Sequence, residues 1–229
     1  DILIKYKIKK IYFRLKPNEK DRDKIKEAIK LLCNKQYIKS KINLILLNLE
    51  KKENILKKNL RKSYKSLINR ENKILSVKSS IKPQNKEKIF EDWKDIHAKA
   101  ILRGGKTISL KTYDLLFKAI KAKECVAFIA YQNEECVGGM LFSLNNNFAI
   151  YESSVNIDII ENDKSRAVGH CLMWNGILEL KKIGIKNFEL GTYYDVTAST
   201  KYLKDWINKE DGITNFKKGF GGDIIPAYY

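Results

Sequence analysis

Three short apolar stretches in the middle of the chain, separated by polar turns, constrain the fold more than any other feature. The stretches are Val126–Gln132, Cys136–Ser143 and Phe148–Ser154, with the turns Asn133-Glu134-Glu135 and Asn145-Asn146-Asn147 between them. Apolar runs of this length, bounded by Asn-rich turns, are typical of strands joined by tight connections. The sequence therefore predicts an antiparallel meander of three strands.

The segments around this meander have the periodicity of helices or the apolar runs of strands. In chain order they are helices over 87–102 and 109–123, the meander, a helix from Ser165 as N-cap to Ile183 with Gly184 in the left-handed conformation, a strand Ile185–Leu190, a helix around Ser199–Lys209, the segment Phe216–Gly222 (FKKGFGG) and a strand Ile224–Tyr229. A meander followed by helix, strand, helix and strand is the order of an N-acetyltransferase-like fold. We therefore expect an α+β protein with a mixed, mainly antiparallel sheet flanked by helices.

The first part of the chain is strongly basic. Residues 1–90 hold 27 Lys and Arg against 9 Asp and Glu, and residues 91–229 hold 18 of each, so the net charge of +18 lies before residue 91. A positive field of this kind favours phosphate-rich partners such as RNA, anionic lipid or a nucleotide-linked substrate. The alternative is that many lysines are solvated filler in a chain whose composition is biased towards Ile and Asn.

We expect this basic part to contain strand structure in 2–15, a helix over 19–35, a buried strand at 43–49, one long basic helix over 50–76 and a polar connector Ser76–Lys88. The predicted domains are then a partial first half over 1–49, a basic helix and linker over 50–86, and the main domain over 87–229.

The basic helix carries a predicted contact stripe for an anionic partner. The stripe consists of Arg61, Lys62, Lys65 and Arg70, which lie near one face of the helix. The alternative is a solvated helix that links two parts of the chain. No recognised RNA-binding signature is present.

Several classes of protein are disfavoured by the sequence. No apolar run approaches the ~20 residues that span a membrane, and the first residues do not have the pattern of a signal peptide. Cys33, Cys125, Cys136 and Cys171 are scattered, and neither histidine has zinc-ligand spacing from a cysteine. We therefore expect a cytoplasmic protein with reduced thiols and no metal site.

Short motifs occur in a characteristic order along most of the chain. They are Tyr12–Pro17 (YFRLKP), Leu60–Arg70, Trp93–His97 (WKDIH) with Arg103, Tyr151–Ser154, Gly169–Trp174 (GHCLMW), Phe188–Gly191 (FELG) and FKKGFGG with Pro226. Together they resemble the FemABX group of peptidoglycan-bridge aminoacyltransferases and the FemAB-like N-acyltransferases. The resemblance implies one complete acyltransferase-like half over 87–229, preceded by only the end of a first half.

The FKKGFGG segment carries the predicted catalytic residues. Acyl transfer to an amine needs a neutral amine, a carbonyl held close to it, and positive charge where the oxyanion forms. Lys217 can supply that charge, and the resemblance implies that Phe216 shapes the donor channel beside it. Gly221 and Gly222 permit close backbone approach to a substrate. The alternative is a tight structural turn with its phenylalanines in the core.

Further substrate contacts are predicted outside this segment. Tyr151 and Ser153 stand at the end of a predicted strand, where alternation lets only some side chains face a substrate. The block of motifs that carries the resemblance adds Arg103 as a substrate-binding residue.

Other polar residues have more than one interpretation. His97 and His170 are candidate bases, with structural histidines as the favoured alternative. Glu189 can orient an amine or form a buried ion pair, and Asp195 is expected in an Asx turn.

The segment Arg166–Cys171 (RAVGHC) raises a second donor. Acetyltransferases of the expected fold use a Q/R-x-x-G-x-G/A loop entering a helix, whose free N–H groups bind the pyrophosphate of coenzyme A. Arg166 and Gly169 match this pattern, but Cys171 replaces the small final residue. An ordinary first turn of a helix is the alternative, so the segment favours neither aminoacyl-tRNA nor acyl-CoA as co-substrate.

Three functions remain open. The leading one is FemAB-like transfer of an aminoacyl or acyl group onto an amine of a cell-envelope or glycan precursor, in a ternary complex and without a permanently bound cofactor. The second is an acetyl-CoA-dependent N-acetyltransferase acting on an amino-sugar nucleotide. The third is a non-catalytic module of the same fold that binds RNA, including tRNA, or an anionic membrane surface.

Overall fold

The computed structural model describes residues 41–105, 107–157, 160–161, 164–193 and 212–228. The elements expected over 2–15, 19–35 and Ser199–Lys209 lie outside the described residues, as does Asp195.

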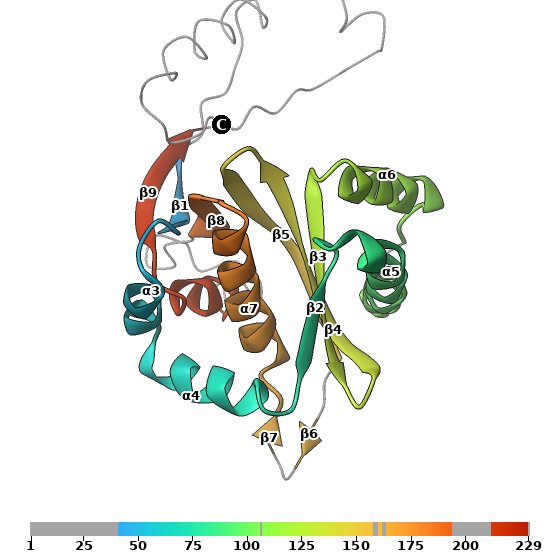
Figure 1. Cartoon of the computed structure of the whole chain (residues 1–229), viewed down its shortest axis with the longest axis horizontal. Helices are drawn as coiled ribbons and strands as arrows, with labels where there is room; N and C mark the ends of the chain where they lie inside the picture. The colour runs from blue at the N-terminus through green and yellow to red at the C-terminus, as the bar shows by residue number, and fades with distance from the viewer. Residues whose placement is uncertain (1–40, 106, 158–159, 162–163, 194–211, 229) are drawn as a thin grey trace, which may run out of the picture.

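A seven-stranded sheet with the order β2-β3-β4-β5-β8-β1-β9 forms the centre of the molecule (Figure 1). Its strands are β1 (Lys41–Asn48), β2 (Ser76–Ser79), β3 (Cys125–Gln132), β4 (Glu135–Asn145), β5 (Phe148–Asn156), β8 (Asn187–Tyr193) and β9 (Asp223–Tyr228). Every neighbouring pair is antiparallel except β5 and β8, which run parallel. The predicted α+β fold with a mixed, mainly antiparallel sheet is therefore confirmed.

The predicted meander is β3, β4 and β5. Asn133 and Glu134 turn the chain between β3 and β4 with φ of 48° and 68°, and Asn146 does so after β4 with φ of 53°. These left-handed conformations match the twist of the strands that tight hairpins join, and Asn tolerates them well.

Helices cover both faces of the sheet (Figure 1). They are α3 (Glu53–Asn59), α4 (Lys62–Glu71), α5 (Lys86–Arg103), α6 (Leu110–Lys121) and α7 (Val168–Lys182), with a 3-10 turn η2 (Pro83–Asn85) and a helical segment at 212–218. The helices α5 and α6 lie over β3 and β4 on one face, and α7 crosses the other face with α4 beside it. A small hairpin of β6 (Ile160–Glu161) and β7 (Lys164–Ser165) precedes α7.

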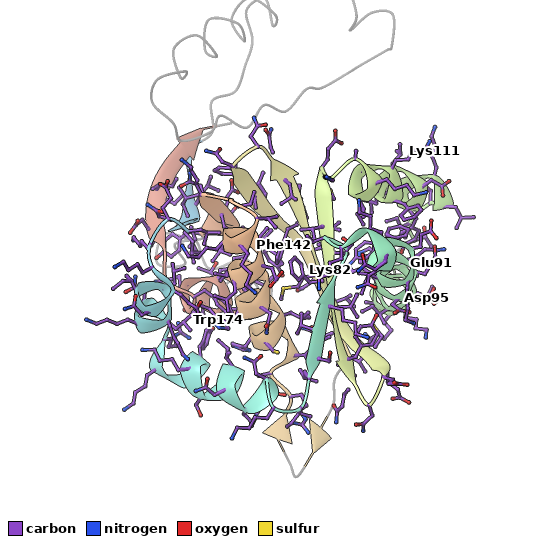
Figure 2. All side chains as sticks on the ribbon, viewed as in Figure 1. Lys82, Glu91, Asp95, Lys111, Phe142 and Trp174 are labelled. Atoms are coloured by element: carbon purple, nitrogen blue, oxygen red, sulfur yellow. The ribbon has the colours of Figure 1, made fainter. Side chains whose placement is uncertain are left out.

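Each face has its own apolar core. Phe128, Phe142 and Phe188 are fully buried between the sheet and α7, and Trp93 is 1% exposed beneath α5. Burying an aromatic side chain of this size contributes about 2–3 kcal/mol relative to leaving it in water. Figure 2 shows Phe142 in the interior, with the charged side chains of α5 and α6 at the outer edge.

The basic segment differs from its prediction of one long helix over 50–76. It forms two short helices, α3 and α4, because Leu60 and Arg61 adopt extended conformations with ψ of 142° and 139°. The extended Arg61 donates its backbone N–H to the carbonyl of Gly219 at 2.8 Å. This contact joins the basic segment to the FKKGFGG turn, and a continuous helix would use the same N–H internally.

Two smaller predictions also change. The expected connector Ser76–Lys88 contains a strand, β2, which pairs with β3. Ser165 lies in β7, so the N-cap of α7 is Ala167 and the prediction of Ser165 as N-cap was wrong. Gly184 does adopt the expected left-handed conformation, with φ of 85°.

The strand β1 lies between β8 and β9, although it comes more than 130 residues before β8 in the chain. It pairs antiparallel with both neighbours. The sheet thus takes strands from both sides of residue 87, where the domain boundary was predicted, and the division into domains stays a prediction.

Candidate functional site

The sheet opens between β5 and β8. These strands pair only where Phe148, Ala149 and Ile150 meet Asn187, Phe188 and Glu189. Beyond those residues β5 continues to Asn156 and β8 to Tyr193 without pairing to each other in the described part of the chain. We call the region beside 151–156 and 190–193 the β5–β8 opening. Strand edges that do not pair with a neighbouring strand are places where proteins can bind extended ligands.

A β-bulge decides which side chains of β5 face the opening from the α7 side. In the register of β4 and β5, Phe142 is opposite Tyr151 and Leu141 is opposite Ser153, so Glu152 is an extra residue. Tyr151 packs against the core beneath α7, and its hydroxyl donates to Ser154 Oγ at 2.6 Å. Ser153 shares its face with Leu141, which belongs to the core beneath α5. The bulge therefore places Ser154, and not Ser153, beside Tyr151.

Lys217 brings an ammonium group to the same place. Its Nζ lies 5.9 Å from the centre of the Tyr151 ring. A Cβ atom built on Gly191, at the far side of the opening, comes within 3.0 Å of that Nζ. Gly191 also has φ of 96°, a conformation that only glycine adopts without strain. The glycine thus leaves room for the lysine head group between β5 and β8.

Four aromatic rings form a cluster next to Lys217: Tyr64, His170, Phe216 and Phe220. The Tyr64 ring lies 4.3 Å from His170 and 5.1 Å from Phe220, both edge-on, and Phe216 lies 5.1 Å from His170. The Tyr64 hydroxyl donates to the carbonyls of Asn215 and Phe216, each at 3.2 Å. This aromatic cluster fixes the helical segment that carries Lys217.

His170 is held neutral in this cluster. Burial, and then the positive charge of Arg61, lower its pKa to about 4, while Glu71 acts in the opposite direction. Burial raises the pKa of Tyr151. Near pH 7 the side chains of His170 and Tyr151 beside Lys217 are therefore neutral.

The amino end of α7 contacts a buried carboxylate. Glu71, at the end of α4, has no exposed surface, and its Oε1 accepts the backbone N–H of Ala167 at 3.3 Å. Arg70 Nε donates to the same oxygen at 2.7 Å, and Arg166 lies 3.6 Å from Oε2. Glu71 shares the buried stripe of α4 with Tyr64 and Ile68.

The predicted basic stripe is only partly available to a partner. Lys62 is exposed, and Arg61 is exposed with its guanidinium 5.3 Å from the Tyr64 ring centre. Lys65 donates to the carbonyl of Lys58 at 3.1 Å, and Arg70 is engaged with Glu71. The structure thus brings Arg61 close to the aromatic cluster and uses Arg70 internally.

Other predicted site residues lie away from the β5–β8 opening or serve the protein itself. Arg103 ends α5, on the opposite face of the sheet from α7. Cβ atoms on Gly221 and Gly222 would meet Asn59 at 3.1 Å and the carbonyl of Leu46 at 2.9 Å, so both glycines approach the protein's own backbone.

The remaining candidates, His97 and Glu189, lie within the protein's own packing. His97 stacks on Trp93 and hydrogen-bonds Tyr113 through Nδ1 at 3.1 Å, which confirms the structural interpretation of this histidine. Glu189 is 2% exposed on β8. In the described ranges no group of three or more His, Cys, Asp or Glu side chains is placed to hold a metal ion. Helices in the same ranges are too short or too polar to cross a bilayer.

Sequence reasoning missed Tyr64, Glu71 and Ser154 as neighbours of the site. A signal for Glu71 was present, since it is the single acidic residue between Glu53 and Glu87 in a strongly basic segment. Tyr64 and Glu71 also follow the helical period of Leu60 and Ile68. The position of Ser154 depends on the bulge, which the sequence does not mark.

No protein-family model and no curated protein sequence matches this chain. Among solved structures it is similar to FemX, with a TM-score of 0.60 and 11% identity over 92% of this chain and 69% of FemX. It is also similar to the C-terminal domain (DUF2156) of a protein from Agrobacterium fabrum assigned as a lysylphosphatidylglycerol synthetase, with a TM-score of 0.57 and 13% identity over 83% of this chain and 60% of that one. L-PGS from Bacillus licheniformis gives a TM-score of 0.57 and 13% identity over 88% and 64%.

These similarities concern the fold. The predicted resemblance to FemAB-like proteins is confirmed at that level, because FemX shares the arrangement of strands and helices over most of this chain. The chain spans between 60% and 69% of the length of the three structures.

Proposed function

We propose that this chain is an acyltransferase that joins an aminoacyl or acyl group to an amine at the β5–β8 opening. The observation that carries the proposal is the position of Lys217, whose ammonium lies between the Tyr151 ring and Gly191 where the sheet separates. An ammonium in a partly desolvated site stabilises the oxyanion that forms during acyl transfer.

The proposed chemistry needs no covalent intermediate on the protein. The neutral amine nitrogen attacks the carbonyl carbon of the donor, a C–N bond forms, and the carbonyl oxygen takes the electron pair next to Lys217. The tetrahedral intermediate then collapses, the bond to the leaving oxygen or sulfur breaks, and the proton lost by nitrogen goes to the leaving group. The three cysteines that the structure describes have raised pKa values, and desolvation is the main cause in each, so their thiols are poor nucleophiles.

The proposed substrates are an amine on a cell-envelope or glycan precursor and an activated aminoacyl or acyl donor. The name lysylphosphatidylglycerol synthetase describes an aminoacyl group joined to a membrane component, and one similar structure carries that name. The exposed Arg61 and Lys62 next to the aromatic cluster support a phosphate-bearing donor such as aminoacyl-tRNA. A cytoplasmic location is part of this proposal.

Replacing Lys217 tests the proposal. Purified chain would be incubated with a mixture of radiolabelled aminoacyl-tRNAs, or with labelled acetyl-CoA, and with a lysine-containing nucleotide-linked muropeptide or an amino-sugar nucleotide. We expect Lys217→Met to lower transfer by about 10²–10³-fold, the effect of removing one oxyanion-stabilising group. Lys182→Met is the control, because Lys182 is exposed at the carboxyl end of α7, pairs with Glu179 and is not placed in the mechanism.

A second candidate function is a module that binds an anionic polymer without catalysis, which the exposed cations of α3 and α4 favour. The same variants separate it from the first. If wild type and Lys217→Met bind tRNA equally with a steep salt dependence, and neither transfers a label from any donor, the acyltransferase proposal is wrong and the binding function is supported.

A further inference from the structure

The amino end of α7 is the position at which an acyltransferase of this fold would bind the pyrophosphate of coenzyme A. Helix amino ends attract phosphate because their first N–H groups are unpaired and the helix dipole is positive there. In this chain Arg166 and Gly169 occupy the matching positions of the sequence pattern. A phosphate can bind Arg166 and the first N–H groups of α7 only where no other group of the protein already contacts them.

The two groups that would bind a pyrophosphate are the Arg166 guanidinium and the amino end of α7. Both face the carboxylate of Glu71. Glu71 Oε1 accepts the N–H of Ala167, the N-cap of α7, and Glu71 Oε2 lies 3.6 Å from the Arg166 guanidinium. The Arg166 side chain is only 10% exposed and that of Glu71 is not exposed. A negative charge therefore lies beside Arg166 and the N-cap amide of α7, two of the groups that would attract a phosphate.

Further contacts hold the Glu71 carboxylate in this position. Arg70 holds Oε1 from the side of α4, and the apolar stripe of α4 that includes Ile68 packs into the same core as α7. Moving the carboxylate away would remove the anion beside Arg166 and break the hydrogen bonds from Ala167 and Arg70. A pyrophosphate next to a retained Glu71 would meet repulsion between like charges in a site with little water.

We propose that Glu71 takes the place of a bound pyrophosphate at the amino end of α7, so that coenzyme A does not fit this chain and its acyl donor is held by other groups. This inference rests on the proposed acyltransferase function and narrows its donor. An ester-linked donor whose phosphates contact exposed cations such as Arg61 and Lys62 can bind without displacing Glu71. A coenzyme A thioester bound through α7 does not.

The test measures binding of coenzyme A itself by titration calorimetry, to wild-type chain and to Glu71→Gln. The glutamine keeps the size and an acceptor for Ala167 and removes the charge. We expect no saturable binding by wild type at millimolar coenzyme A, and an affinity at least about tenfold higher for Glu71→Gln. Glu53→Gln, which removes an exposed charge from the neighbouring helix α3, is the control and should bind no better than wild type.

Two outcomes overturn the inference. One is micromolar binding of coenzyme A to wild type with NMR shifts at the amides of Val168 and Gly169, a measurement that does not depend on a folded variant. The other is a folded Glu71→Gln that binds no better than wild type. Failure of the proposed function looks different: no donor supports transfer, whereas wild type still rejects coenzyme A. Acetyl transfer from coenzyme A that Lys217→Met abolishes would retain the function and refute the role of Glu71.

Discussion

The two faces of the sheet carry similar sets of aromatic and polar side chains but arrange them differently. Beneath α5 and α6, Trp93 stacks on His97, His97 hydrogen-bonds Tyr113, and the Tyr131 hydroxyl donates to Asp92. We call this the closed face, because the strands beneath it pair along their length. The hydroxyl groups of Tyr113 and Tyr131 and the imidazole of His97 thus find partners within the protein.

On the other face, which we call the open face, a tyrosine, a histidine and two phenylalanines form a cluster of comparable composition. Here the supporting strands separate after Ile150, and Lys217 lies in the β5–β8 opening with Tyr151 and Gly191. The comparison teaches that composition does not distinguish a site from a core. What distinguishes the candidate site from the core is the interruption of strand pairing and the charge of Lys217 beside it.

The largest expected effect on stability belongs to the closed face. Trp93→Ala removes a fully buried side chain and should lower the free energy of unfolding by about 3–5 kcal/mol. Denaturant titration followed by circular dichroism measures this. Lys217→Met should change the same quantity by less than about 0.5 kcal/mol, as is usual for half-exposed positions. Equal losses in the two variants would mean that the faces do not differ in the way described.

A smaller effect is expected where the open face is packed against the FKKGFGG turn. A Cβ atom on residue 219 would lie 2.1 Å from the Tyr64 ring, so Gly219→Ala should destabilise the protein by about 1–3 kcal/mol and should lower transfer by displacing Lys217. Gly212→Ala is the control in the same helical segment, because no atom of the residues that the structure describes lies within 4 Å of its Cβ. Thermal unfolding and the transfer assay report the two effects. A stable, active Gly219→Ala would show that the Tyr64 contact does not position the lysine.

The smallest expected effect is a dependence on pH that distinguishes the two histidines, which are the only ones in the chain. The folded-state pKa of His170 is about 4, below its unfolded value of 6.5. Between these values the unfolded chain binds a proton that the folded chain does not, so this contribution is present above pH 6.5 and is lost as the pH falls towards 4. Burial also lowers the pKa of His97.

NMR titration of the two imidazoles, with melting curves at pH 7 and pH 5, measures this dependence. His170→Gln should lose less stability between these pH values than wild type, apart from a constant offset caused by the lost ring contacts. Carboxylates elsewhere contribute equally to both proteins and cancel in the difference. Two results would contradict the burial of His170 in the aromatic cluster. One is an equal loss of melting temperature between pH 7 and pH 5 in wild type and His170→Gln, and the other is an imidazole of residue 170 that titrates near 6.5.

Much of the fold could be predicted because it depends on local patterns. The meander follows from apolar runs and Asn-rich turns, and the helices α5, α6 and α7 follow from periodicity. The break at Leu60 and Arg61 could not be predicted, because its cause is a hydrogen bond to Gly219, far along the chain. Intrinsic helix propensity favours a continuous helix there.

Part of the candidate site could also be predicted from local patterns in the sequence. Lys217 and Tyr151 were expected to belong to one site, and the structure does bring them together. Ser153 was expected on the same face, but one extra residue in β5 reverses the alternation after Tyr151. Glu71 escaped attention because its importance lies in its contact with α7, which only the packing of α4 creates.

The position of β1 between β8 and β9 has a consequence for how the protein folds. This strand must pair with β8 and β9, which follow it by more than 130 and 170 residues, so this side of the sheet depends on contacts of very long range. Loop-closure entropy makes such contacts form late, and translation supplies β9 after the other strands of this sheet. Until then β1 has an unpaired edge, and the helical segment with Lys217 has no finished sheet to rest on. We therefore expect the candidate site around Lys217 to be the final part of the molecule to form, and a chain shortened before β9 to aggregate.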